Sequence, residues 1–135
     1  MVPLGALVQV FGTVDAVGGA VSIIHEDGIQ SPPVLGQKLL VGQTVQTEQT
    51  GELNVVTEDG GLLAVRPNTR FKVLQFQATQ DHKAMIDMSL VRGALRSITG
   101  WIGKINPSGY RLATPTATIG IRGTGHETTV VGPEI

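Results

Sequence analysis

Histidines and carboxylates are the side chains of this sequence best suited to acid–base catalysis or metal binding. Each of the three histidines stands directly beside an acidic residue, in the pairs His25–Glu26, Asp81–His82 and His126–Glu127. Adjacent residues on a β-strand point to opposite faces, so sequence neighbours of this kind do not form working pairs. Catalysis requires a base, a nucleophile or metal, and an orienting group that converge on one pocket. The sequence therefore predicts no catalytic residue, no metal site and no bound cofactor.

The glycine-rich stretch over residues 120–125 superficially resembles a phosphate-binding loop. Such loops lead into a helix whose N-terminal N–H groups and dipole hold the anion. Here residues 126–131 have the β-branched pattern of a strand, and they include Glu127, which would repel phosphate. Residues 120–123 also have the glycine spacing of a loop that clamps RNA, but the helices that flank such a loop are not indicated by the sequence. We interpret the glycines as bends in β structure, and we exclude nucleotide binding.

Cations and aromatic rings come closest together between residues 92 and 111, where we predict partner or ligand contact. The predicted contact residues are Arg92, Arg96, Trp101, Lys104, Tyr110 and Arg111. Trp101 and Tyr110 beside arginines suit a glycan of the cell envelope, although packing in the core is the expected alternative for Trp101. Nucleic-acid binding needs many more aromatics interleaved with cations. The isoelectric point of about 6.3 also argues against a nucleic-acid partner.

Charge is distributed unevenly along the chain, although the formal net charge is only −1. Residues 1–87 carry five basic and nine acidic side chains, whereas residues 88–126 carry five basic side chains and no acidic one. In the first interpretation, the two halves pair across one sheet system and opposite charges face each other. In the second, the cations form a basic face for an anionic partner.

The elements that position these residues are predicted to be strands. Glycine is abundant with 18 residues, while charged residues make up 16% and aromatic residues 4%. Val, Ile and Thr between many turns, with little helix-forming sequence, indicate one all-β domain over residues 1–135. There is no cysteine, which excludes disulfides and thiolate metal sites. We expect short antiparallel strands and glycine turns with little helix, in a sandwich-like or solenoid-like arrangement.

Turn residues divide this chain into short segments. Asp27-Gly28 and Asp59-Gly60 each indicate a hairpin, and their spacing of 32 positions raises the hypothesis of stacked, similar units. Gly12 indicates a bulge or bend in the first strand.

Two later segments are harder to assign. Along residues 71–76, alternation predicts that Phe71, Val73 and Gln75 share one face. Residues 85–102 fit both helical and strand spacing, and we predict two short strands about Gly93 with a single helical turn over residues 97–101.

Several segments, in this order, resemble the FecR-type domain. They are residues 42–47, 53–61, 66–69, 91–96, 113–117 and 121–124, and the resemblance covers about residues 30–131. The last two contain the closing Thr-Pro and Arg-Gly-Thr motif, whose residues here are Thr114, Pro115, Arg122, Gly123 and Thr124. We interpret this motif as structural: a closing strand pair in which Arg122 ties neighbouring strands through carbonyl or carboxylate contacts.

The resemblance implies an all-β module on the outer side of the inner membrane of a Gram-negative bacterium, acting in signal transduction through protein–protein interaction. In the signalling members, this module relays the occupancy of an outer-membrane iron transporter to a cytoplasmic sigma factor. The present sequence departs from that pattern because it has no anti-sigma segment, no membrane helix and no room for a further C-terminal subdomain. Gly125-His126 also stands where the family usually has an aromatic at the second position.

No apolar run is long enough to cross a bilayer, and the N-terminus lacks the basic start of a signal peptide. Our hypothesis is that the first residues follow the cut of a removed signal, which would place the protein in the periplasm or outside the cell. We therefore predict a non-catalytic module for sensing or protein interaction in the cell envelope. The alternative is a module that binds peptidoglycan or another polysaccharide.

Overall fold

The computed structural model describes residues 9–115, 118–120 and 125–130, the last two ranges by their backbone only. Within these residues, strands dominate and the two helices are short, so the prediction of an all-β fold with little helix is confirmed. The helices are α1 (Trp101–Ile105) and the 3₁₀ helix η2 (Pro107–Gly109). The strands are β1 (Val10–Gly18), β2 (Val21–Ile24), β3 (Gln30–Ser31), β4 (Lys38–Leu40), β5 (Thr44–Thr47), β6 (Glu52–Thr57), β7 (Leu62–Val65), β8 (Arg70–Gln77), β9 (Met85–Ile98), β10 (Tyr110–Ala113), β11 (Thr118–Gly120) and β12 (Gly125–Val130).

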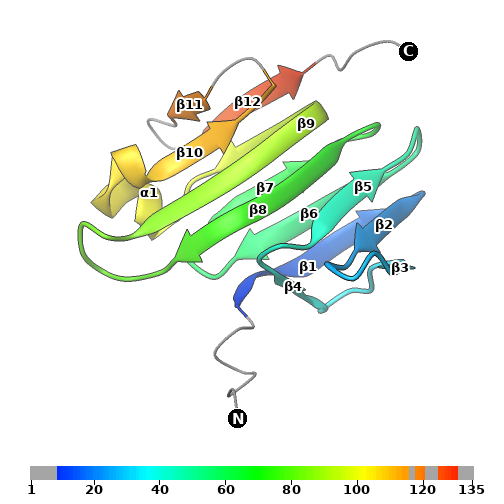
Figure 1. Ribbon diagram of the computed structural model, residues 1–135, viewed down its shortest axis with the longest axis horizontal. Coiled ribbons are helices and arrows are strands. Elements are labelled where there is room, and N and C mark those ends of the chain that lie inside the picture. The colour runs from blue at the N-terminus through cyan, green and yellow to red at the C-terminus, as the bar shows by residue number, and fades with distance from the viewer. Residues whose placement is uncertain (1–8, 116–117, 121–124, 131–135) are drawn as a thin grey trace.

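The strands form one curled sheet, and the long strand β9 belongs to both of its halves. The first half of β9 pairs with β8 and β10, and the second half pairs with β7 and β12. We call the two halves of the sheet arm A and arm B. Arm A has the order β4-β1-β6-β7-β9-β12, and arm B has the order β3-β2-β5-β8-β9-β10-β11. In Figure 1 they form two layers, with β8 of arm B in front of β6 and β7 of arm A.

Apolar side chains that alternate along the strands fill the space between the arms. Leu53 and Val55 of β6, with Leu63 and Val65 of β7, are each at most 1% exposed. They belong to the same buried cluster as Val73 of β8 on the opposite arm. Because side chains alternate with a period of two along a strand, the polar residues between these positions lie on the outer faces. The result is a single core enclosed by two outward faces.

The bend of β9 at Gly93 carries the chain from arm B to arm A. Gly93 has a φ of +96°, in the left-handed region that favours glycine. A Cβ atom built on it would lie 2.1 Å from Oγ1 and 2.4 Å from Cα of Thr69. The bend therefore depends both on the backbone freedom of glycine and on the absence of a side chain.

Both predicted hairpins are confirmed. β6 and β7 pair around Asp59-Gly60, and β2 and β3 pair around Asp27-Gly28. They lie in different arms, so they are not stacked repeats of one unit. The irregularity predicted at Gly12 is also confirmed, because the pairing of β1 with β4 shifts register between Val10 and Gly12.

Two local predictions need correction. Residues 85–98 form one continuous strand bent at Gly93 rather than two strands, and the helical turn begins at Trp101 rather than at residue 97. In β8, Gln75 is exposed and Phe76 is 4% exposed in the core. The cause is an irregularity between Val73 and Gln75, which reverses the alternation beyond it.

Candidate functional site

The structure does not gather the predicted contact residues on one surface. The bend at Gly93 puts the exposed Arg92 in arm B and the exposed Arg96 in arm A. Arg111 is exposed on β10 of arm B, directly opposite Asp87 of β9. The other three residues are at the end of the molecule near α1: the half-buried Trp101, the exposed Lys104 and the buried Tyr110.

Tyr110 is a core residue, so the expectation that it offers an exposed ring needs correction. Its side chain is 3% exposed, and its hydroxyl lies 2.5 Å from Oγ of the buried Ser97. Burial is the main cause that raises the pKa of Tyr110 to about 12, and the negative charge of Asp59 adds to it, while the hydrogen bond with Ser97 opposes it. Trp101 is thus the one aromatic ring of the predicted pair that reaches the surface.

Asp59 organises the segment around α1. Its side chain is 2% exposed, accepts a hydrogen bond from the Thr57 hydroxyl at 2.5 Å and accepts another from the N–H of Ile102 at 3.2 Å. Its carbonyl accepts the N–H of Trp101 at 2.9 Å. Asp59 thus accepts hydrogen bonds from backbone N–H groups at the start of α1, which have no partner within the helix. We therefore assign Asp59 a structural role.

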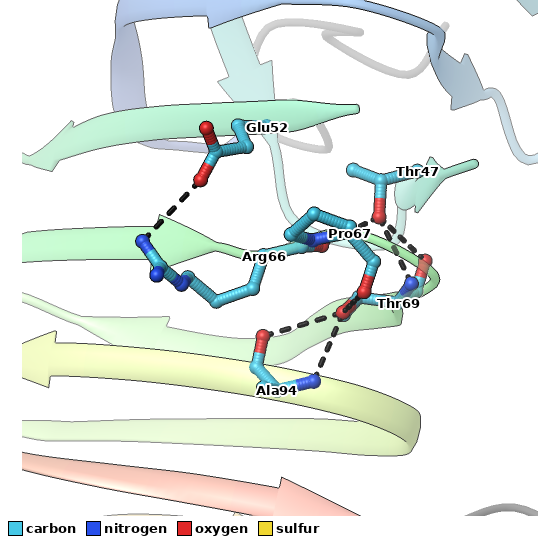
Figure 2. A network of polar contacts seen from close by, with 6 residues as sticks. All are labelled: Thr47, Glu52, Arg66, Pro67, Thr69 and Ala94. Atoms are coloured by element: carbon cyan, nitrogen blue, oxygen red, sulfur yellow. Dashed lines mark hydrogen bonds and ion pairs between the residues drawn. The ribbon is translucent and has the colours of Figure 1, made fainter. Parts of the chain in front are cut away.

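At the end of β7 that is far from Asp59, the hydroxyl groups of two threonines hydrogen-bond to backbone groups of segments that pass from one arm to the other (Figure 2). Oγ1 of Thr47 donates to the carbonyl of Arg66 at 2.6 Å and accepts the N–H of Thr69 at 2.9 Å. Oγ1 of Thr69 accepts the N–H of Ala94 at 3.0 Å and lies 3.1 Å and 3.3 Å from the carbonyl oxygens of Pro67 and Ala94. Both threonines are fully buried, so these contacts satisfy backbone groups that water cannot reach. We call this network the threonine corner.

The threonine corner also positions the side chain of Arg66 on the outer face of arm A. The N–H and the carbonyl of Arg66 are both used within the corner, so its backbone is held on both sides. The guanidinium lies 3.3 Å from the carboxylate of Glu52, and both side chains are about half exposed (Figure 2). Beside them is an open hollow of about 370 Å³, lined by Ala16, Val17, Gly18, Glu52, Asn54 and Arg66. It is shallow and mostly polar, and it suits a peptide or sugar group better than an apolar ligand.

Three cations gather on the outer face of arm B, and we call Arg70, Lys72 and Arg92 the cationic patch. Arg70 and Lys72 alternate along β8, and Arg92 of β9 lies directly opposite Arg70. Nη1 of Arg70 donates to Oε1 of Gln46 at 2.6 Å, and Nε2 of Gln46 donates to Oε2 of Glu48 at 3.2 Å. Among the described residues, the Arg66–Glu52 contact is the one ion pair, so none of the three cations has a carboxylate within 4 Å.

A bulge in β9 turns Arg92 toward the surface. The pairing of β8 with β9 shifts between Arg70 and Phe71, because Arg70 faces Arg92 while Phe71 faces Leu90. Val91 is the extra residue, and both it and Arg92 are exposed, whereas strict alternation from the buried Leu90 would point Arg92 inward. The sequence alone could have placed Arg70 and Lys72 on an outer face, since they alternate with Phe71. It carried no signal for the bulge that brings Arg92 beside them.

The histidines that the structure describes are not arranged for metal binding. His25 lies 2.9 Å from Oγ of Ser31 through Nε2 and 3.0 Å from the amide nitrogen of Gln43 through Nδ1. Because Oε1 of Gln43 accepts the N–H of Leu40, its amide nitrogen is the donor and Nδ1 of His25 is the acceptor. Nowhere in the described part of the chain do three His, Cys, Asp or Glu residues come together as metal ligands would. The side chain of His126 lies outside the described residues.

The structure describes only part of the closing Thr-Pro and Arg-Gly-Thr motif. β10 and β11 pair antiparallel, and Thr114 and Pro115 directly follow β10 in the chain. β12 then pairs with β9 in the other arm. The tie predicted for Arg122, with Gly123 and Thr124, lies outside the described residues.

Residues 43–132 match the family described as FecR protein. The chain belongs to the FecR family. The match begins at β5, so β1 to β4 precede it; β1 extends arm A beside β6, and β2 extends arm B beside β5. A solved structure described as "Cell surface anchoring domain" is similar with a TM-score of 0.45 and 20% identity, over 47% of this chain and 84% of that one. No curated protein matches the sequence.

Proposed function

We propose that this FecR-family chain is a non-catalytic extracytoplasmic module that recognises another protein in the cell envelope, in the periplasm or outside the cell. The observation that carries the proposal is the family match over residues 43–132, which spans both arms of the fold. Among the described residues, no helix is long and apolar enough to cross a membrane. The described outer faces, rather than a deep pocket, are the surfaces available for recognition.

The distribution of aromatic side chains favours a protein partner over a glycan. Phe11, Phe71, Phe76 and Tyr110 are all buried in the core. Among the described residues, the half-buried Trp101 is thus the one aromatic ring near the surface. Protein recognition by a sheet uses its faces and strand edges and needs no aromatic platform. A glycan would have Trp101 and Lys104 on α1 as its main contacts.

Site-specific photo-crosslinking in the native envelope tests the proposal. The crosslinker replaces Lys72 on the outer face of arm B, Asn54 on the outer face of arm A, or Trp101 on α1, each in the protein expressed from its natural full-length gene. We expect a discrete protein adduct from one sheet face, recovered from the extracytoplasmic fraction.

Two results would contradict the proposal. One is the absence of a protein adduct from all three positions together with a cytoplasmic location. The other is retention on purified peptidoglycan that Trp101→Ala abolishes, because this result would assign the protein to glycan binding. Genes for a sigma factor and an outer-membrane receptor beside this gene would extend the proposal to signalling across the envelope.

A further inference from the structure

The cationic patch on arm B brings together charges that oppose folding. Arg70 and Arg92 lie directly opposite each other on adjacent antiparallel strands, an arrangement in which like charges are destabilising. Lys72 adds a third positive charge two residues along β8, about 6.8 Å away by strand geometry. Two acidic residues lie near these cations. Glu48 reaches Arg70 only through the side chain of Gln46, and Asp87, two residues along β9 from the position opposite Lys72, is paired in register with Arg111.

The bulge at Val91 causes the repulsion between Arg70 and Arg92, because it turns the side chain of Arg92 to the outer face. Without it, the side chain of Arg92 would point toward the core, and Arg70 would have no cation opposite. Bulges are found where a strand must re-aim a side chain, often next to functional sites. An arrangement that lowers stability at an exposed surface is typical of residues that act on a partner.

We infer that the cationic patch binds an acidic, extended segment of a partner polypeptide. This inference rests on the proposed role in protein recognition and names the chemistry of the partner. Alternate side chains of an extended chain are also about 6.8 Å apart, so carboxylates at alternate positions match Arg70 and Lys72. Guanidinium groups bind carboxylates through paired charge-assisted hydrogen bonds, and Arg92 lies beside Arg70 to take a second contact.

Other anionic partners fit this surface less well. A phosphate site built from the backbone needs a concave nest of free N–H groups, whereas the backbone of β8 is paired on both sides, with β5 and with β9, which leaves only side chains to contact phosphate here. Glycans and nucleic-acid bases stack on aromatic rings, and none of the exposed residues described on arm B is aromatic. The strand neighbours directly opposite Arg70 and Lys72 include Thr44, Gln46 and Ser89, whose side chains can hydrogen-bond to a peptide, and the exposed Val91 and Leu74 add apolar contact surface beside them.

The inference is tested by the binding of fluorescently labelled peptides to the full chain. Fluorescence anisotropy measures this binding at several salt concentrations. The main probe is a short peptide of alternating Glu and Thr. The comparison probes are a peptide of the same composition with its Glu residues in one block, the alternating Gln–Thr peptide, and inorganic polyphosphate. The variants are Arg70→Gln/Arg92→Gln and, as a control with the same change in net charge, Lys83→Gln/Lys104→Gln.

We expect the alternating acidic peptide to bind in a salt-dependent manner. Binding should weaken about tenfold in the Arg70→Gln/Arg92→Gln variant and less than twofold in the control variant. The patch variant should melt at the same or a higher temperature than the parent, which excludes unfolding as the cause. An equal loss in the control variant, equal binding of the block peptide, or tighter binding of polyphosphate would each overturn the inference.

The partner captured by crosslinking separates this inference from the proposed function. If that partner binds the parent but loses affinity for the patch variant, both stand. If it binds the parent and the patch variant equally, the module recognises a protein and the cationic patch is not its docking surface.

Discussion

Replacement of Gly93 by alanine tests the claim that β9 joins the two arms through a close backbone approach. Gly93 has a φ of +96°, and an added Cβ would lie 2.1 Å from Oγ1 and 2.4 Å from Cα of Thr69. The left-handed conformation costs a residue with a Cβ about 1–2 kcal/mol. Displacing Thr69 would also weaken its two hydrogen bonds with Ala94, each worth about 1 kcal/mol. The expected loss in the free energy of unfolding is therefore about 3–4 kcal/mol.

Gly28→Ala is the matched control for this substitution. Gly28 has a similar φ of +89°, but apart from its own chain neighbours no heavy atom lies within 4 Å of an added Cβ. It should lose only the conformational part, about 1–2 kcal/mol. Denaturant unfolding of both variants measures the difference directly, and thermal melting should place Gly93→Ala about 5–10 °C below Gly28→Ala. Equal stability of the two variants would refute the argument that the contact with Thr69 holds the arms together.

Three further predictions concern buried or clustered polar groups. Because burial raises the pKa of Tyr110 from 10.0 to about 12, the unfolded chain loses this proton first, so stability should fall between about pH 10 and 12. Tyr110→Phe should remove this part of the alkaline fall in urea titrations, and an unchanged profile would contradict the assignment. Asp59→Ala should lower the free energy of unfolding by about 2–4 kcal/mol, since it leaves the N–H of Ile102 without its hydrogen-bond acceptor. The amide hydrogen of Ile102 should then exchange faster with solvent than in the parent protein, and an unchanged exchange rate would refute the assignment. Arg92→Gln should raise the free energy of unfolding by about 0.5 kcal/mol by removing the charge opposite Arg70, and a clear loss in urea unfolding would disprove the repulsion.

Local patterns in the sequence were sufficient for the hairpins and for much of the core. Asp-Gly turns between β-branched runs specify short hairpins, because their backbone conformation matches the twist of the strands. The alternation that places Phe71 and Val73 inside also predicts their buried state correctly. These features depend on neighbours a few residues apart, which is the range that a single sequence describes.

The predicted contact residues are separated in the structure by an effect that acts over a longer range. Arg92 and Arg96 are four residues apart, yet the bend at Gly93 sends them to different arms. Among the described residues, the charges of the two halves face each other only in part as the first interpretation expected. Arg111 does face Asp87 across two strands, but Arg92 faces another cation. Register and bulges decide these partners, and they depend on how distant strands pair rather than on local composition.

The amino-acid sequence was enough to predict the all-β class, the turns, the absence of disulfides and the ordered motifs of the FecR family. These follow from residue type and short spacing, which act before the chain has any tertiary contacts. The folded arrangement was needed to show that Tyr110 is a core residue, that Asp59 organises α1 and that Arg70, Lys72 and Arg92 form the cationic patch. Each of these depends on strands distant in sequence, whose pairing is selected by the packing of the whole core. The face that we propose for recognition is therefore a product of the fold, and a bulge of one residue in β9 completes it.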